Sequence, residues 1–248
     1  MTPILEANNL SKTFAGMRAV NDVHVEFYTD RVTGIIGPNG AGKTTLVHLL
    51  TGHVQPDAGQ ILFEGQDITR LSADQRVNAH VCRTFQVVDI FPRLTVFENI
   101  QIARITREAK NLRWFGGAAK EARDAVEAAL EEVGMWGFRN RRAEQLSHGQ
   151  QRRIDLAVTL ATDPELCFLD EPTSGVSPKE RDQMLELIAR LAEAKRTTFV
   201  LIEHDMEVIF NLCAHVICMH RGAILAEGTP DDIRANKEIK EIYLGEEV

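Results

Sequence analysis

The chain alternates between two patterns of apolar and polar residues. Short, continuous apolar runs that are rich in β-branched residues occupy the first and last thirds, and such runs are typical of buried strands. We predict strands at residues 4–9, 23–28, 32–36, 60–63, 81–85, 166–169, 198–202, 216–219 and 223–226. Because runs that are apolar throughout indicate strands covered on both faces, the pattern predicts an α/β protein with a mainly parallel sheet.

The middle third has helical spacing instead. Apolar residues recur every three or four positions between residues 95 and 161, most clearly at Ala122, Ala125, Val126, Ala129, Leu130 and Val133. Further helices are predicted at 45–50, 72–77 and 179–191, and from Pro230 and Lys237. We therefore predict one domain over residues 1–248, in which residues 1–86 and 163–248 form an α/β core and residues 87–162 an inserted helical subdomain.

The composition narrows the classes of partner. The 248 residues are 44% hydrophobic and 26% charged, which is ordinary for a globular protein. A net charge of −8 argues against nucleic acid and anionic lipid as partners. The sequence shows no secretory signal and no apolar run long enough to span a bilayer, so a role at a membrane requires docking on another protein. The four cysteines lack C-x-x-C spacing and lie in apolar runs, which predicts reduced core thiols; they are Cys82, Cys167, Cys213 and Cys218.

One stretch, Gly37-Pro38-Asn39-Gly40-Ala41-Gly42-Lys43-Thr44, fits G-x-x-x-x-G-K-[ST], the pattern of a phosphate-binding loop. It lies between a predicted strand and a helix that continues through Thr45, which is the context that the pattern requires. Its glycines permit backbone angles that turn N–H groups toward one anion, and the positive end of the helix adds to that field. We predict that Lys43 reaches the β- and γ-phosphates of a nucleotide and that the Thr44 hydroxyl ligates Mg²⁺.

Two acidic residues follow the predicted strand 166–169. An acid at the carboxyl end of a strand near a phosphate-binding loop is suited to hold Mg²⁺, which predicts this role for Asp170. The next residue, Glu171, is suited to act as the general base that polarises an attacking water. Taken alone the pair would read as a turn cap; beside the phosphate-binding loop the catalytic interpretation is favoured.

Three further residues each allow two interpretations. Gln86 ends a predicted strand and either contacts Mg²⁺ or the attacking water, or is an ordinary polar strand end. His204 follows the strand 198–202 and either contacts the γ-phosphate or makes a local hydrogen bond. Phe14 lies in a predicted turn at residues 11–14, where it is either a platform for an adenine ring or a ring at the edge of the core.

The stretch Leu146-Ser147-His148-Gly149-Gln150 precedes a predicted helix. It is either a simple helix N-cap or a second anion site formed by the Ser147 hydroxyl and the Gly149 N–H. Because it lies in the helical subdomain, one chain is not expected to bring it to the phosphate-binding loop. A head-to-tail pair of chains would, with each nucleotide between two subunits.

Together these motifs resemble the nucleotide-binding subunit of an ATP-binding cassette (ABC) transporter, and the resemblance covers essentially the whole chain. The stretches that correspond to the family's Walker A loop, Q-loop, signature, Walker B strand and switch histidine are Gly37–Thr44, Gln86, Leu146–Gln150, Leu166–Glu171 and His204. The resemblance implies a RecA-like P-loop NTPase core with a mainly parallel sheet, an antiparallel β portion and the helical subdomain.

The resemblance also implies a role for each residue. ATP and Mg²⁺ are the implied cofactors, and Phe14 matches the aromatic residue that stacks on adenine. The implied metal ligands are Thr44, Gln86 and Asp170, and the implied catalytic residues are Glu171 and His204. Ser147, Gly149 and Gln150 would bind the nucleotide of the opposite chain.

The family further implies the partners. These are transmembrane permease subunits, gripped by the region from Gln86 to Thr95, and a second ATPase chain, identical or related; a binding protein is an indirect partner, and nucleic acid is none. The implied location is the cytoplasmic face of the inner membrane, as a peripheral subunit. Cargo recognition lies in the other subunits in this family, so the present chain does not encode it.

The sequence departs from the family pattern at two positions. His148 replaces the first glycine of LSGGQ, and Ser177 stands where the family usually has an aspartate that contacts the opposite chain. Three stretches resemble the ATPases of branched-chain and hydrophobic amino-acid uptake: Arg83–Gln86, Gly149–Arg153 and Tyr243–Glu246.

Other functions fit less well. A non-transport ABC ATPase of DNA repair or translation would carry a long coiled-coil insertion or a second cassette, and a GTPase would carry N-K-x-D, which Asn236–Ile239 lacks at its last position. Two surface features stay open: residues Asn111–Gly117 form either a partner-facing loop or local packing, and the basic cluster Arg139, Arg141 and Arg142 is either a solvated face or a binding site.

Overall fold

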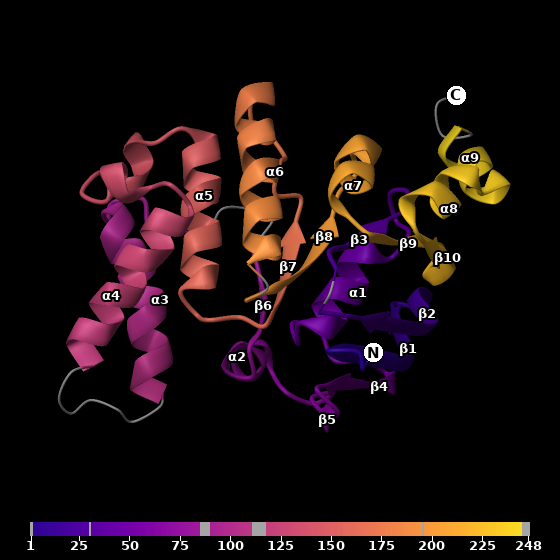
Figure 1. The fold of residues 1–248 in the computed structure, drawn as a ribbon. Coiled ribbons are helices and arrows are strands. Elements are labelled where there is room, and N and C mark those ends of the chain that lie inside the picture. Colours follow the sequence, from indigo (N-terminus) through magenta and orange to yellow (C-terminus); the bar gives the residue numbers. More distant parts are fainter. Residues whose placement is uncertain (1, 30, 85–89, 111–117, 195, 245–248) are drawn as a thin grey trace.

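Two β-sheets and the helix between them form the core of the molecule (Figure 1). The computed structural model describes residues 2–29, 31–84, 90–110, 118–194 and 196–244. The larger sheet has the strand order β10-β9-β3-β8-β7-β6, and the smaller has the order β2-β1-β4-β5. Helix α1 (Lys43–Leu50) contributes apolar side chains to a core that includes residues of both sheets, so the glycine-rich loop before it is held rigidly.

The larger sheet is parallel except at one edge. Its strands are β3 (Thr33–Ile36), β6 (Val81–Arg83), β7 (Leu166–Asp170), β8 (Thr198–Ile202), β9 (His215–His220) and β10 (Ala223–Gly228). The last strand pairs antiparallel with β9, and the other pairs are parallel. The central strands are buried along their whole length, as their continuous apolar runs predicted, and their carboxyl ends meet at one edge of the sheet.

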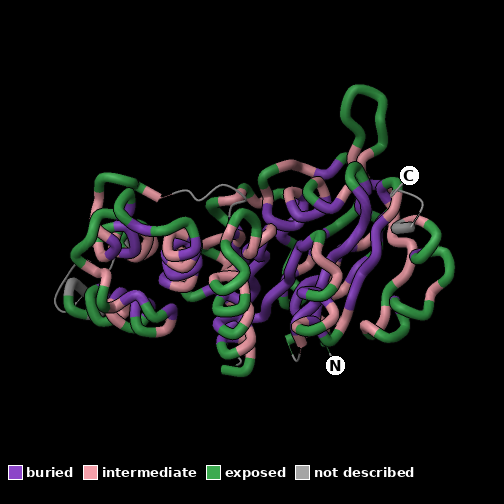
Figure 2. Tube along the Cα trace, turned by 90° about the horizontal axis from the view of Figure 1, so that it is seen from above, coloured by how far each residue is buried: buried purple, intermediate pink, exposed green. Residues whose placement is uncertain are grey.

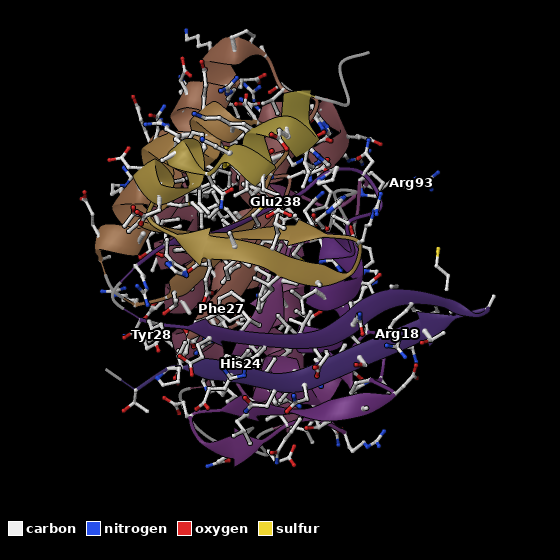
Figure 3. All side chains as sticks on the ribbon, turned by 90° about the vertical axis from the view of Figure 1, so that its right-hand side faces the viewer. Arg18, His24, Phe27, Tyr28, Arg93 and Glu238 are labelled. Carbon is white, nitrogen blue, oxygen red and sulfur yellow. The ribbon has the colours of Figure 1, made fainter. Side chains whose placement is uncertain are left out.

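The smaller sheet is antiparallel and consists of β1 (Leu5–Phe14), β2 (Met17–Phe27), β4 (Ala58–Phe63) and β5 (Gln66–Asp67). The prediction of a turn at residues 11–14 was wrong, because β1 continues to Phe14 and the chain reverses at Ala15 and Gly16. Figure 3 labels Arg18 toward the far end of this long hairpin. The end is exposed on both faces, so no alternation of apolar and polar residues marks it as a strand.

Most of the remaining helices cover the other face of the larger sheet or form a separate layer (Figure 1), whereas the short helix Ala73–Asn78 packs against the end of α1, where Arg76 donates to the Leu49 carbonyl. They are α2 (Ala73–Asn78), α3 (Val96–Lys110), α4 (Ala118–Glu132), α5 (His148–Leu160), α6 (Pro178–Glu193), α7 (Met206–Leu212), α8 (Pro230–Ala235) and α9 (Lys237–Leu244), with short 3₁₀ turns at Trp136–Phe138 and Ala143–Gln145. Helices α3, α4 and α5 pack on one another, and their apolar faces join the buried residues of α6 and the sheet (Figure 2).

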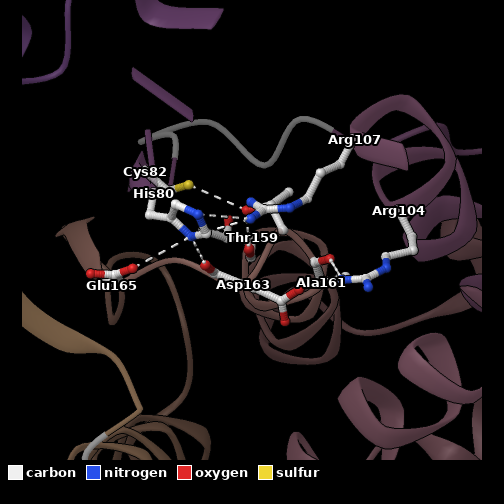
Figure 4. Close-up of polar contacts among 9 residues, drawn as sticks. His80, Cys82, Arg104, Arg107, Thr159, Ala161, Asp163 and Glu165 are labelled. Carbon is white, nitrogen blue, oxygen red and sulfur yellow. Dashed lines mark hydrogen bonds and ion pairs between the residues drawn. The ribbon is translucent and has the colours of Figure 1, made fainter. Parts of the chain in front are cut away.

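Polar contacts join α3 to the core (Figure 4). Arg104 pairs with Asp163 and donates to the Ala161 carbonyl at 3.3 Å, and Arg107 Nη2 lies 3.2 Å from His80 Nδ1. His80 also contacts the Asp163 carbonyl through Nδ1 at 2.7 Å. These contacts lie where β6 begins and α5 ends, so they fix the helical layer against the edge of the sheet.

The cysteines and the helix lengths bear on two predictions made from the sequence. The four cysteines are buried free thiols, as predicted. No helix within the described residues is both long and apolar enough to cross a bilayer.

Candidate nucleotide-binding site

The glycine-rich loop has the backbone that the sequence predicted. Gly37, Gly40 and Gly42 all have positive φ, and Gly42 (φ 102°) is the N-cap of α1. A Cβ atom at Gly37 would lie 2.4 Å from the Met219 carbonyl oxygen, and one at Gly42 would lie 2.4 Å from the Ala19 carbonyl oxygen. Both the conformation and the close packing therefore exclude larger residues, and the loop presents the positive end of α1.

Lys43 is buried inside this loop. Its Nζ atom donates to the Gly37 carbonyl and, at 3.1 Å, to the Pro38 carbonyl. The ammonium group is therefore held within the loop by two uncharged acceptors. A phosphate oxygen would be a stronger, charged acceptor for the same donor.

The loop lines one wall of a cleft of about 580 Å³. Its lining residues come from the loop, from the end of the β1–β2 hairpin and from the carboxyl ends of the sheet strands: Phe14, Met17, Arg18, Ala19, Asn39–Thr45, Glu171, Ile202, His204 and Arg221. The tertiary structure thus places Phe14, Lys43, Thr44, Glu171 and His204 around one space. The Phe14 ring is 43% exposed and has Lys12 Nζ 5.5 Å from its centroid, so it is not packed into the core.

Glu171 and His204 lie together because their strands are neighbours. Asp170 is paired in register with Ile202, so the two chains leave the sheet side by side. His204 Nε2 lies 3.0 Å from Glu171 Oε1. Glu171 has φ 47°, a left-handed conformation that is uncommon for a residue with a Cβ, and its N–H donates to the Ile202 carbonyl at 2.9 Å. This sharp turn directs its side chain toward the cleft.

Asp170 has a partner that our sequence reasoning missed. The Arg83 guanidinium makes a buried ion pair with the Asp170 carboxylate, and both side chains are almost fully enclosed. Arg83 is in register with Phe168 on the neighbouring strand β6. A buried charge requires such a partner, so an arginine at the end of the strand beside an acidic strand end was the signal available in the sequence.

A second carboxylate behind the cleft also escaped sequence reasoning. Glu203 is only 5% exposed, and its Oε1 accepts hydrogen bonds from the Thr173 N–H at 3.1 Å and the Thr173 hydroxyl at 2.7 Å. Because Glu203 directly precedes His204 and Thr173 lies in the loop after Glu171, these hydrogen bonds connect the two segments that carry Glu171 and His204. Burial raises the pKa of Glu203 above its usual range, with a smaller contribution in the same direction from the charge of Glu171.

This raised pKa predicts a pH-dependent stability difference. A carboxyl group with a raised pKa in the folded state contributes most to stability when protonated, and the contribution is lost as pH rises through the folded pKa. Glu203→Gln stays neutral and can still accept from Thr173. Its melting temperature should therefore increase relative to wild type between pH 4.5 and 8, by about 2–4 °C, the effect of ~1 kcal/mol in a domain of this size. Thermal melts of both proteins across this range test it; a difference that does not change with pH would contradict it.

The signature stretch is the N-cap of α5, as one of its two interpretations predicted. Ser147 Oγ accepts from the Gln150 N–H at 3.3 Å, and the Gln150 side chain accepts from the Ser147 N–H at 3.1 Å, which completes a capping box. In Figure 1, α5 is separated from α1 by α6 and the strands β7 and β8. Within one chain, the signature is therefore remote from the phosphate-binding loop, as expected.

Ser177 and the signature converge on one further residue. Ser177 caps α6, and its hydroxyl donates to Glu180 Oε2 at 2.8 Å. The Ser147 hydroxyl donates to the other oxygen of the same carboxylate, Oε1, at 2.7 Å. The tertiary structure thus joins two motifs that are 30 positions apart in the sequence. Nothing in the sequence singled out Glu180.

Two of the predictions concern residues outside the part of the chain that the structure describes, and a third concerns the basic cluster. Gln86 and Asn111–Gly117 lie outside the described residues. In the basic cluster, Arg139 stacks on Trp136 at 4.3 Å and Arg141 stacks on Phe138 at 5.1 Å from the ring centroid. Local packing therefore accounts for two of its three residues.

The geometry agrees with comparisons to known proteins. The ABC transporter family matches residues 20–174. The high-affinity branched-chain amino acid transport ATP-binding proteins BraF of Pseudomonas aeruginosa and LivG of Escherichia coli are each 40% identical, over 98% of this chain and 98% of their own. The lipopolysaccharide export system ATP-binding protein LptB of Haemophilus influenzae is 33% identical over the same shares. These relatives are transport proteins, and they favour transport over DNA repair or translation.

Solved structures of ATP-binding cassettes have the same fold as this chain. The structure of the ADP conformation of MJ1267, an ATP-binding cassette of an ABC transporter, has a TM-score of 0.87 and 30% identity over 99% of this chain and 100% of its own. A nucleotide-free ATP-binding cassette has a TM-score of 0.84 and 31% identity over 98% and 99%. The RecA-like core, the antiparallel sheet and the helical layer are those of this fold. The chain therefore belongs to the ABC transporter family, as an ATP-binding subunit with the architecture of an ATPase.

Proposed function

We propose that this chain powers the import of branched-chain or other hydrophobic amino acids by hydrolysing ATP. The observation that carries the ATPase assignment is the single cleft that combines the phosphate-binding loop with Glu171 and His204. The cargo class is supported by the names of relatives that align over nearly the whole chain at 40% identity. Import is favoured over export because the lipopolysaccharide export protein is the less similar relative, at 33%.

ATP would lie across the cleft with its adenine ring on Phe14 and its phosphates in the loop. Residues Gly37 and Asn39–Gly42, with Thr44 and Thr45 at the start of α1, present backbone donors to the phosphates, and Pro38, which has no N–H, completes the loop. Lys43 would exchange its loop carbonyls for the β- and γ-phosphate oxygens. The side chain already lies within the loop, so the exchange needs no large movement of the backbone.

The donor set fits Mg²⁺. Within the described residues, no group of three His, Cys, Asp or Glu side chains is arranged to hold a metal by itself. Mg²⁺ prefers oxygen ligands and usually takes only one or two protein ligands, together with phosphates and waters. The Thr44 hydroxyl would provide one of these oxygens, and the Asp170 carboxylate, which is paired with Arg83 in the structure, would provide another; we propose Gln86 as a further ligand. Bound Mg²⁺ would neutralise the charge that develops on the phosphates.

Glu171 would act as the general base and His204 would hold it in place. The two side chains face the same cleft, and the 3.0 Å separation of Nε2 and Oε1 allows the imidazole to fix the carboxylate. The carboxylate then accepts the proton of the water that attacks the γ-phosphate. Glu203 supports both residues through Thr173.

The active form would be a head-to-tail dimer of this chain with itself or with a related ATPase. We infer that the helical subdomain, residues 87–162, brings the Ser147 hydroxyl, the Gly149 N–H and Gln150 to the nucleotide of the opposite chain. The exposure of Ser147 at the start of α5 supports this role. ATP would thus close the dimer, and hydrolysis would open it.

The permease subunits would dock beside α3. Exposed apolar residues lie within the region from Gln86 to Thr95, at Phe91, and on the adjoining helix α3, at Ile102 and Ile105. Docking here would place the chain at the cytoplasmic face of the inner membrane, where a binding protein acts on it only through the permeases.

The dimer is tested with Ser147→Arg. A large cation at this position would fill the closing interface, so ATP-dependent dimerisation should be lost while the single chain still binds ATP. Light scattering with ATP in a Glu171→Gln background measures the dimer, and fluorescent nucleotide binding measures the single chain. Ser147→Ala is the comparison variant: it loses the N-cap, at about 1 kcal/mol, and the proposed phosphate contact without adding bulk, so it should dimerise more weakly than wild type but better than Ser147→Arg. Normal dimer formation by Ser147→Arg would refute the composite site.

A further inference from the structure

The Glu180 carboxylate lies against the start of the signature helix. Its two oxygens accept from two hydroxyl groups, those of Ser147 at 2.7 Å and Ser177 at 2.8 Å. A Cβ atom added to Gly149 would lie 2.7 Å from Glu180 Cδ, so the carboxylate also packs directly on the signature backbone. One side chain of α6 therefore holds both the signature stretch and Ser177, the position at which the family usually has an aspartate that contacts the opposite chain.

The Ser147 hydroxyl can donate its hydrogen to only one of two competing acceptors, the Glu180 carboxylate or a phosphate. A serine hydroxyl has one hydrogen to donate. Ser147 Oγ accepts from the Gln150 N–H and gives its hydrogen to Glu180. A phosphate oxygen is itself an acceptor, so the hydroxyl can bind it only by donating the same hydrogen.

We propose that Glu180 is a positioning residue that holds the Ser147 hydroxyl in the separated subunit and must release it when the γ-phosphate of the opposite chain's ATP arrives. The inference rests on the proposed function, because it requires that Ser147 contacts a nucleotide across a dimer. Carboxylate and phosphate are both anions, so the contact also opposes closure by repulsion. The hydrogen bonds from Ser147 and Ser177 lower the pKa of Glu180, so the group carries its charge at neutral pH.

The Glu180→Gln variant distinguishes a residue that holds the Ser147 hydroxyl from one that only stabilises the start of the helix. A glutamine at the third position of a helix retains the capping box, because its amide oxygen accepts from the Ser177 N–H as Glu180 Oε2 does now at 3.3 Å. Its NH₂ group then faces Ser147, where it donates and does not accept. The Ser147 hydrogen becomes free for phosphate.

The experiment measures ATP-dependent dimerisation and nucleotide-free melting of Glu180→Gln in the Glu171→Gln background. Half-maximal dimer formation should require about tenfold less ATP, as expected for loss of one charged hydrogen bond that competes with closure. The melting temperature without nucleotide should fall slightly, by about 1–3 °C. The two readouts move in opposite directions, whereas a residue that only supported the signature would weaken both. Glu186→Gln is the matched control, an exposed glutamate of the same helix, and should change neither.

Two outcomes would overturn the inference. If Glu180→Gln needs as much ATP as its parent or more, Glu180 does not oppose closure. If the effect persists undiminished in a Ser147→Ala background, it does not act through the Ser147 hydroxyl. Failure of the Glu171→Gln parent itself to dimerise with ATP is a different result: it refutes the proposed dimer, and the inference falls with it.

Discussion

Replacing Glu171 with glutamine should leave ATP binding intact and reduce hydrolysis by about 10²–10⁴-fold, the range expected for loss of a general base. Glutamine has nearly the same size as glutamate and can still contact His204, whose Nε2 lies 3.0 Å from Glu171 Oε1. Its amide, however, cannot accept a proton from water. Because hydrolysis is proposed to open the dimer, the ATP-bound dimer should accumulate. Turnover, ATP affinity and dimer mass measured on one preparation test all three expectations.

Asp170→Asn provides the contrast. It should weaken Mg²⁺-dependent nucleotide binding itself, because it removes the charge proposed to hold the metal. It also leaves the buried Arg83 guanidinium without a negatively charged partner, so a lower melting temperature should accompany the loss of binding. If Glu171→Gln hydrolyses ATP at the wild-type rate, Glu171 is not the base, and His204 with Gln86 would be the residues that position the water.

Replacing Lys43 with alanine should weaken ATP binding by on the order of 100-fold or more, since the lysine is proposed to make charged hydrogen bonds to two phosphates. The side chain is buried inside the loop, where it would lie directly against the phosphates. Equilibrium binding of ATP to the single chain is the direct measurement, because it depends on neither hydrolysis nor dimer formation.

The control for Lys43→Ala must separate a lost phosphate contact from a damaged loop. Lys237→Ala removes one positive charge at an exposed position on α9 and should not change ATP affinity. Circular dichroism and melting of Lys43→Ala report on the loop, whose Gly37 and Pro38 carbonyls lose their donor. A folded Lys43→Ala protein that binds ATP as tightly as wild type would refute the assignment of the nucleotide site.

The sequence by itself determined those features that depend on neighbours along the chain. The phosphate-binding loop was predictable because its glycine positions reflect a local backbone requirement, and all three glycines have the positive φ that the pattern implies. The buried parallel strands were predictable because full burial demands continuous apolar runs. The N-cap at Ser147 was also predictable, since capping depends on residues within one turn.

Only the tertiary structure decided which distant groups meet. The pairs Arg83 with Asp170, Glu203 with Thr173 and Glu180 with Ser147 each join residues that are about 30 or more positions apart. A charged residue such as Arg83 at the end of an apolar strand indicates that a partner exists, but the sequence does not identify that partner, because strand order and helix packing decide which residues meet. The extension of β1 to Phe14 was missed for a related reason: an exposed hairpin end is held by backbone pairing, which leaves no pattern in the side chains.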